Sequence, residues 1–209
     1  MRAVLSFKTH SGWAVLIALG VNGKDLHILE RSRVELVKSE DAVWAKQPYH
    51  SAEELEPKAA RDLVKRGIAG ARECAKREVR AASKRLHAAG HDIIGCAVLV
   101  GDPMPDWSVA EILSVHFRMH KAEGFLYQDV LVRAAEACQI PLAKVPLKQL
   151  NAKSAFDSKT KAVVQWISTL GKSVGPPWGK DQKEATLAAT IALQELNLKS
   201  HLQNSELVW

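Results

Sequence analysis

The sequence predicts an α/β domain in which helices cover both faces of a five-stranded mixed sheet. Three strand-like segments separated by turn residues open the chain, which is typical of an antiparallel meander. The remainder alternates helical and strand-like patterns, and this alternation indicates parallel strands joined by right-handed crossovers. Hydrophobic residues make up 47% of the 209 and charged residues 25%, as in ordinary globular proteins. We therefore expect a single domain over residues 1–209 with the order β-β-β-α-β-α-β-α.

The opening meander is expected within the first 37 residues. Residues 3–7 and 13–19 are rich in apolar and β-branched side chains, and the turn-like segment 9–12 separates them. Asn22-Gly23 is a pair that favours a tight hairpin turn. Residues 26–37 then alternate as a third strand, with an irregularity that leaves room for a bulge.

A long helix follows the meander and leads into a buried strand. Residues 39–57 are polar and contain two prolines, so we expect a surface loop or a short helix there. The helical pattern that begins at Lys58 ends at Ala89, and Gly90 supplies the usual left-handed stop. Residues 92–100 form a near-continuous apolar run, which suits a central strand covered on both faces.

The remaining elements complete the alternation. Ser108, with Glu111 three residues later, has the signature of a helix start. In order, we expect a helix over 108–138 with an interruption at Gly124, a fifth strand at 142–145, a broken helix over 147–170, a Gly/Pro loop at 171–179 and a final helix over 181–196.

The net charge of +6 is concentrated in one predicted helix. Residues 58–91 contain ten basic and three acidic residues, so this segment carries +7 and the rest of the chain −1. At about 100° per residue, nearly all of these cations share one helical face. That face is either a solvated helix surface or a surface that binds DNA or RNA, in which case Lys65, Arg72, Lys76 and Arg80 are the candidate phosphate contacts.

The cysteines and the chain start indicate a compartment. Cys74, Cys96 and Cys138 have neither the number nor the spacing of a disulfide framework or a zinc site, so we interpret them as small hydrophobic residues in a reducing environment. The N-terminal segment lacks a signal-peptide pattern, and no apolar run reaches the roughly 18 to 20 residues that cross a bilayer. We expect a bacterial or archaeal cytoplasmic protein with no membrane partner.

Three stretches of the second half follow one another in a familiar order. Residues 122–137 are a helix that begins with Ala-Glu-Gly, residues 140–148 are a strand that ends in Pro-Leu-Lys, and residues 178–189 begin a final helix with Trp-Gly-Lys-Asp-Gln-Lys-Glu-Ala. Together they resemble the RuvC-type Holliday junction resolvases and their YqgF relatives. The resemblance covers most of the chain through degenerate motifs, and it implies a ribonuclease H-like fold.

The resemblance also implies a site for metal ions. In that family, acidic residues from the first strand, the end of the fourth strand and the start of the last helix hold two Mg²⁺ or Mn²⁺ ions for phosphodiester hydrolysis. Asp181 and Glu184 match the last-helix pair, as ligands and catalytic residues, and Asp102 is a shifted match after the fourth strand. The first-strand aspartate is not retained, because this chain has Lys8 and no carboxylate in that turn. A standard two-metal site is therefore incomplete.

Each of these acids has a purely structural alternative. Asp181 and Glu184 have the spacing of a capping box, in which both side chains bond backbone amides at the helix start. Asp102 precedes a proline and is a common turn residue on any fold.

A second chemical cluster lies on the helix after the fourth strand. His116, His120 and Glu123 share one helical face, and two imidazoles with a carboxylate are able to hold a transition metal. Alternatively, these side chains pack toward the sheet. With His10 from the first turn, they suggest a substituted site around the last-helix acids, in which the histidines are metal ligands or proton carriers and Glu123 is a ligand or a base. His120 and Glu123 are the candidate catalytic residues of this cluster.

One aromatic residue lies next to this predicted centre. Trp178 follows two prolines just before the last helix. The indole either stacks on a nucleic-acid base or packs down as a hydrophobic anchor.

These features favour a RuvC-like protein that processes nucleic acid by metal-dependent hydrolysis at a substituted site. The alternative is an inactive, nuclease-derived scaffold that binds nucleic acid or a protein partner. Lys8 favours the scaffold, whereas the histidine cluster favours the enzyme. Residues 195–209 form an apolar C-terminal tail that either folds back or contacts a partner, such as the second subunit of a homodimer.

Overall fold

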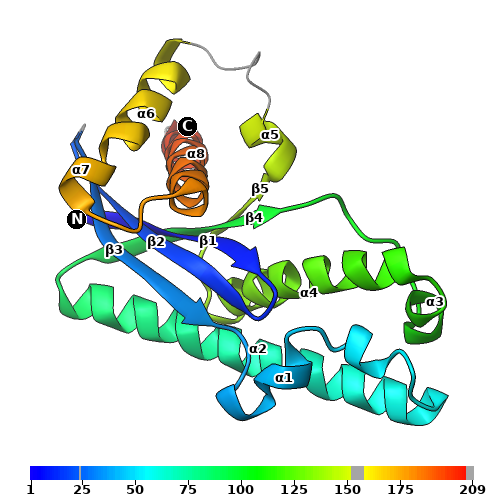
Figure 1. Ribbon diagram of the computed structural model, residues 1–209. Coiled ribbons are helices and arrows are strands. Elements are labelled where there is room, and N and C mark those ends of the chain that lie inside the picture. The colour runs from blue at the N-terminus through cyan, green and yellow to red at the C-terminus, as the bar shows by residue number, and fades with distance from the viewer. Residues whose placement is uncertain (24, 152–157, 206–209) are drawn as a thin grey trace.

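The computed structural model describes residues 1–23, 25–151 and 158–205 of this protein (Figure 1). They contain a five-stranded sheet with the order β3-β2-β1-β4-β5. The first three strands are antiparallel, and β4 and β5 run parallel to β1. This arrangement confirms the predicted fold class. The strands are β1 (Arg2–His10), β2 (Trp13–Asn22), β3 (Asp25–Glu35), β4 (Asp92–Val100) and β5 (Leu142–Pro146).

The meander is longer and tighter than the sequence predicts. The first strand continues to His10, so the turn shrinks to Ser11 and Gly12, and Gly12 takes a φ of +83° that suits glycine. The register between β2 and β3 shifts at Ala18/Leu19, which confirms a bulge in this pair. Gly20 lies beneath the bulged segment, where a Cβ atom would approach Leu29 to within 2.7 Å.

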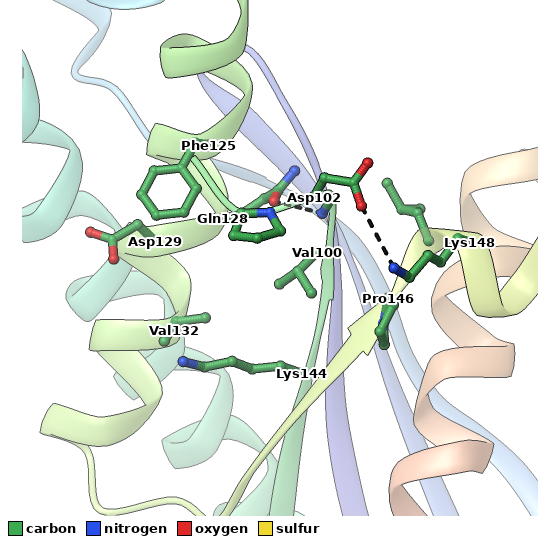
Figure 2. Close-up of a pocket in the computed structure, with 12 residues that line it drawn as sticks. Val100, Asp102, Phe125, Gln128, Asp129, Val132, Lys144, Pro146 and Lys148 are labelled. Atoms are coloured by element: carbon green, nitrogen blue, oxygen red, sulfur yellow. Dashed lines mark hydrogen bonds and ion pairs between the residues drawn. The ribbon is translucent and has the colours of Figure 1, made fainter. Parts of the chain in front are cut away.

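Three short elements and a long basic helix lie between β3 and β4, and a second long helix lies between β4 and β5. The segment predicted as a loop or short helix contains η1 (Ser39–Asp41), α1 (Ala42–Ala45) and η2 (His50–Ala52). The basic helix is α2 (Pro57–Ala88), and Gly90 after it has a φ of +77°. The carboxyl ends of β4 and β5 open onto a pocket beside α4 (His116–Ala137) (Figure 2).

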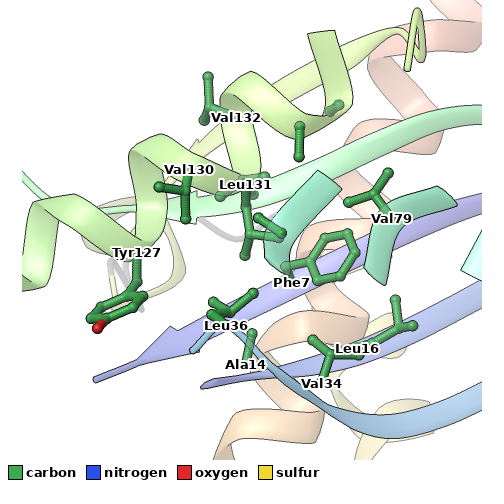
Figure 3. Close-up of a cluster of buried hydrophobic side chains, with 14 of the residues drawn as sticks. Phe7, Ala14, Leu16, Val34, Leu36, Val79, Tyr127, Val130, Leu131 and Val132 are labelled. Atoms are coloured by element: carbon green, nitrogen blue, oxygen red, sulfur yellow. The ribbon is translucent and has the colours of Figure 1, made fainter. Parts of the chain in front are cut away.

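One face of the sheet packs on α2 and α4. Alternate strand residues such as Leu5, Phe7 and Leu16 point to this side and are fully buried. They meet Val79 from α2 and Tyr127 from α4 (Figure 3). Burial raises the pKa of the Tyr127 hydroxyl, which donates hydrogen bonds to two carbonyl oxygens in the segment before α2. Tyr127 of α4 therefore attaches the α1 region to the core.

The opposite face packs on α8 (Lys180–Ser205), which crosses β1, β2, β4 and β5 (Figure 1). Val4 and Leu99 point to this side and meet Ala188, Ala189 and Ala192. Because alanine side chains are small, the helix axis approaches the sheet closely. The even-numbered residues of β1 therefore face α8, which determines where Lys8 and His10 point.

Several helix boundaries differ from the sequence prediction. The helix expected over 108–138 is divided, because α3 (Val109–Leu113) ends before α4 begins. The expected interruption at Gly124 is wrong, since that residue lies inside α4 with open space beside its Cα. Ser108 and Glu111 do form a capping box, and the hydrogen bonds from Ser108 lower the pKa of the Glu111 carboxyl.

The last part of the chain holds α5 (Leu147–Asn151), α6 (Ser158–Thr169) and α7 (Gly171–Val174) before α8. The final helix runs past its predicted end at residue 196, through much of the predicted tail. Residues 206–209 of that tail lie outside the described residues. Among the described helices, none combines the length and the apolar character that a membrane span needs.

Candidate functional site

One ion pair and one hydrogen-bond contact join the end of β1 to the start of α8. The Nζ atom of Lys8 lies 3.1 Å from Oε2 of Glu184, and both side chains are largely buried, with 17% and 14% of their surfaces exposed. The Nε2 atom of His10 lies 2.9 Å from Oδ2 of Asp181. Lys8 and His10 are two residues apart on one strand, and both therefore face α8. Each of the last-helix acids thus has its own basic partner from β1.

Neighbouring side chains support both pairs. The His10 ring stacks on Trp13, with 4.2 Å between centroids and 10° between planes, because the two residues are directly paired across the hairpin. The guanidinium of Arg33 lies 3.9 Å from the Trp13 centroid, a cation–π arrangement. Lys180 adds a second, more distant ammonium at 3.7 Å from Glu184. Trp13 and Arg33 carry no motif of their own in the sequence, and the register of the hairpin is the signal that brings them to His10.

These residues do not fit the two-metal site that the resemblance implies. A dication at Glu184 would have to share its carboxylate with the Lys8 ammonium, and like charges at that spacing repel strongly in a partly buried site. Oε2 of Glu184 is buried, and its ion pair with Lys8 lacks hydrogen-bond geometry. We therefore derive no hydrolytic step through Mg²⁺ or Mn²⁺ here.

The capping alternative for the two acids does not describe them either. The helix begins at Lys180, and the amide of Gly179 donates to Oε1 of Gln182 at 2.9 Å. Gln182, rather than Glu184, therefore reaches back to the helix start. Asp181 lies in the first turn, where a carboxylate interacts favourably with the helix dipole.

Asp102 lies at a different place, on the rim of the pocket at the ends of β4 and β5 (Figure 2). Its Oδ1 atom is 3.8 Å from Nζ of Lys148, and both side chains are mostly exposed. The pocket has a volume of about 440 Å³ and an apolar floor that includes Val100, Val132 and Pro146. Among the described residues, the ion pair of Asp102 is therefore with α5, and Asp102 does not join the acids of α8.

Glu123 on α4 is buried and holds the segment before α2 in place. Only 3% of its side chain is exposed. Oε1 accepts hydrogen bonds from the backbone amides of Tyr49 and His50 at 3.2 and 3.1 Å, and Oε2 lies 2.8 Å from Nδ1 of His50. Burial, together with the negative charge of Glu123, raises the pKa of Tyr49. His50 was not predictable as a site residue, because nothing in its polar segment indicates that it returns to α4.

His116 and His120 lie beside His50 at the start of α4. The Nε2 atoms of His116 and His120 are 3.1 Å apart, and the ring centroid of His50 lies 5.1 and 4.5 Å from theirs. Nδ1 of His116 lies 3.9 Å from Oε1 of Glu53. One nitrogen from each histidine lies within 4.8 Å of the other two, a spacing suited to a metal ion.

The structure thus divides the substituted site suggested by the sequence into two separate clusters. His10 lies on the α8 face of the sheet with Asp181 and Glu184. His116, His120 and Glu123 belong to α4, which packs on the opposite face (Figure 1). The sheet itself separates the two groups.

Trp178 is used as an internal anchor. Its indole Nε1–H donates to the carbonyl oxygen of Ile167 at 2.9 Å, and its ring packs over Gly171. The preceding loop is tied down by Arg31, whose guanidinium donates to the three carbonyl oxygens of residues 175–177 at 2.6 to 3.0 Å. These contacts correspond to the packing alternative for Trp178.

Comparison with known proteins gives a likeness in chain course only. No family model matches the sequence, and no curated protein matches it. Two solved structures of RuvC from Thermus thermophilus are similar, one of them in complex with a Holliday junction substrate. Each comparison covers 90% of this chain and 90% of the RuvC chain, with 11% sequence identity and a TM-score of 0.49. At this distance the likeness transfers no site and no activity.

The cations of α2 are exposed to solvent, except that Lys76 is half-buried. Three of these cations are paired: Lys58 with Asp62, Arg77 with Glu78, and Arg85 with Glu30. The hydrogen bonds that Arg77 and Arg85 donate to their carboxylate partners raise the pKa of both arginines. Within the described part of the chain, no acidic group lies within ion-pair distance of Lys65, Arg72, Lys76 or Arg80.

Proposed function

We propose that this protein binds DNA or RNA along the exposed face of α2 and does not hydrolyse it by a two-metal mechanism. The observation that carries the proposal is the row of cations without acidic partners, Lys65, Arg72, Lys76 and Arg80. Arg72, Lys76 and Arg80 are one turn apart, so they repeat about every 6 Å along the helix. A row of this kind contacts successive phosphates of a nucleic-acid backbone, which supply most of the affinity in non-specific binding.

The second part of the proposal rests on Lys8. Its ammonium supplies the positive charge beside Glu184 that a metal ion would supply to the corresponding acid of a two-metal nuclease. The Nε2 atom of His10 lies at hydrogen-bond distance, 2.9 Å, from Oδ2 of Asp181 and engages the second acid. Lys8 and His10 are therefore the partners of Glu184 and Asp181, and the activity that we propose is nucleic-acid binding alone.

Binding is tested by fluorescence anisotropy with labelled four-way junction DNA, duplex DNA, single-stranded DNA and RNA. With four phosphate contacts, log K falls with a slope of about −3.6 against log salt, so affinity drops roughly 100-fold between 50 and 200 mM salt. Absence of binding to all four probes at 50 mM salt contradicts the proposal. Equal affinity at both salt concentrations contradicts it as well.

Variants assign the binding surface to α2. The triple variant Arg72→Glu/Lys76→Glu/Arg80→Glu reverses three cations of the row, and we expect it to abolish binding at 50 mM salt. The matched control Lys38→Glu/Lys144→Glu/Lys172→Glu makes the same change in charge at exposed positions outside α2. It lowers affinity only through net charge. If both triple variants lose the same affinity, the surface lies elsewhere.

Hydrolysis is tested by incubating the same four substrates with the protein in excess Mn²⁺ and separating the products on denaturing gels. We expect intact substrate. Cleavage that disappears in Asp181→Asn and in Glu184→Gln, but persists in the control Lys172→Glu, overturns the non-catalytic part of the proposal and leaves the binding surface untouched.

A further inference from the structure

The strongest feature that the proposed function does not use is the group of histidines on the α4 face of the sheet. His50 comes from η2, whereas His116 and His120 are one turn apart on α4. Residues more than sixty positions apart thus bring three imidazoles together. We propose that His50, His116 and His120 bind one Zn²⁺ ion.

The orientation of His50 is the first argument for a ligand. Its Nδ1 atom faces Oε2 of Glu123 at 2.8 Å, and Glu123 is itself fixed by two backbone amides of the same segment. With Nδ1 engaged in this way, Nε2 is the nitrogen left for a ligand. That atom is buried and has no hydrogen-bond partner. A carboxylate that orients a histidine from behind is the usual support of zinc ligands in proteins.

The spacing of the ligand atoms is the second argument. The Nε2 atoms of His116 and His120 are 3.1 Å apart, and the three ligand nitrogens all lie within 4.8 Å of one another. Two nitrogens bound tetrahedrally to zinc at about 2.05 Å are about 3.3 Å apart, so His116 and His120 are already at ligand spacing. A small movement of His50 toward them completes the triangle.

The donor set selects the class of metal. Three neutral imidazole nitrogens suit Zn²⁺ and related transition metals, whereas Mg²⁺ and Ca²⁺ require oxygen ligands. The carboxylates of Glu123 and Glu53 lie behind His50 and His116, at 2.8 and 3.9 Å from their Nδ1 atoms, and offset the charge of a dication. Binding of a hard cation at this place is therefore not expected.

The exposure of the cluster determines the coordination. About 64% of the His116 side chain is exposed, whereas 20% of His50 is. Three protein ligands with one open side leave the fourth position to solvent, as in zinc sites where water or a substrate oxygen completes the tetrahedron. The proposed ion is thus held from the protein side by His50 and is accessible from the solvent side.

The test is titration of the purified full-length protein, stripped with a chelator, with ZnCl₂ in a calorimeter. We expect one Zn²⁺ per chain. The variants His50→Ala, His116→Ala and His120→Ala lose at least about 100-fold in affinity, and Glu123→Gln, which weakens the support of His50 without removing a ligand, loses about 10- to 100-fold. Far-UV circular dichroism confirms that each variant is folded. The control His87→Ala removes an exposed histidine on α2 and leaves binding unchanged.

Cobalt gives an independent readout of coordination. Co²⁺ added to the stripped protein produces the visible absorption bands of a tetrahedral site, Zn²⁺ displaces it, and a large excess of Mg²⁺ does not. Binding of Zn²⁺ with unchanged affinity in the His116→Ala/His120→Ala double variant overturns the proposal. Absence of stoichiometric Zn²⁺ binding by the wild-type protein does the same. Neither outcome affects the nucleic-acid proposal, which is read by anisotropy with the metal-free protein.

Discussion

Replacing Lys8 by methionine removes the ammonium while keeping most of the volume of the side chain. At the observed Nζ to Oε2 distance of 3.1 Å, an effective dielectric constant near 20 corresponds to a gross attraction of about 5 kcal/mol. Desolvation of the two largely buried ions offsets more than half of it. We therefore expect Lys8→Met to lower the free energy of unfolding by about 2 kcal/mol, because Glu184 is left buried with only its distant neighbour Lys180.

The assay is urea denaturation followed by circular dichroism, applied as a double-mutant cycle. Lys8→Met, Glu184→Gln and the double variant are compared with the wild type, and we expect a coupling energy of at least about 1 kcal/mol. In thermal unfolding the same loss lowers Tm by about 4 to 8 °C for a chain of this length. Lys180→Met is the matched control, because it makes the same chemical change beside the same carboxylate at a side chain that is 81% exposed.

The Lys180→Met control shows how much a lysine beside Glu184 contributes when it is exposed. An exposed pair contributes little, so Lys180→Met is expected to be nearly neutral. If Lys8→Met is no more destabilising than Lys180→Met, or if the cycle shows no coupling, the ion pair does not stabilise the site. In that case Lys8 does not compensate the charge of Glu184 in place of a metal ion.

Three further predictions test packing around the sites. Tyr127→Phe removes a buried donor and is expected to lower the free energy of unfolding by about 1 to 2 kcal/mol. Burial raises the pKa of this tyrosine in the folded state, so the stability of the wild type falls as pH rises above about 10. Urea denaturation at pH 8 and 11 is expected to show a smaller fall for the variant than for the wild type. An equal fall in both contradicts the assignment. Arg31→Ala releases the three carbonyls of residues 175–177 and is expected to speed proteolysis in that loop, whereas Arg133→Ala, which removes an exposed arginine from α4, does not. Ellman's reagent at pH 8 is expected to modify Cys138 first, because burial raises the pKa of Cys96 and shields it; rapid modification of Cys96 in the folded protein contradicts this order.

The sheet and most of its elements were predictable because their signals are local. The Asn22-Gly23 turn, the apolar run of β4 and the Ser108 capping box each depend on a few neighbouring residues. The break between α3 and α4 was not predictable from helix propensity. Residues 114 and 115 carry no glycine or proline, and yet Val115, which is 40% exposed, takes an extended conformation.

The partners within the candidate sites depend on strand parity and on contacts distant in sequence. The absence of a carboxylate at the end of β1 was visible in the sequence, but the pairing of Lys8 with Glu184 and of His10 with Asp181 follows from the register of β1 against α8. His50 illustrates the opposite case. Its role depends on the return of a polar loop to Glu123, and one sequence contains no signal for that contact.

The Lys8–Glu184 pair has a consequence for how this end of the molecule is assembled. In an ion-dependent site, crowded carboxylates repel one another until dications arrive, so the site is under electrostatic strain whenever it is empty. Here the compensating ammonium of Lys8 and the imidazole that contacts Asp181 are both covalently part of β1, and the junction of β1 and α8 is complete as soon as the chain folds. Chelators or fluctuations in ion supply therefore leave this junction unchanged. For the same reason, Lys8→Asp alone would crowd another carboxylate against Glu184 without supplying any cation to balance it.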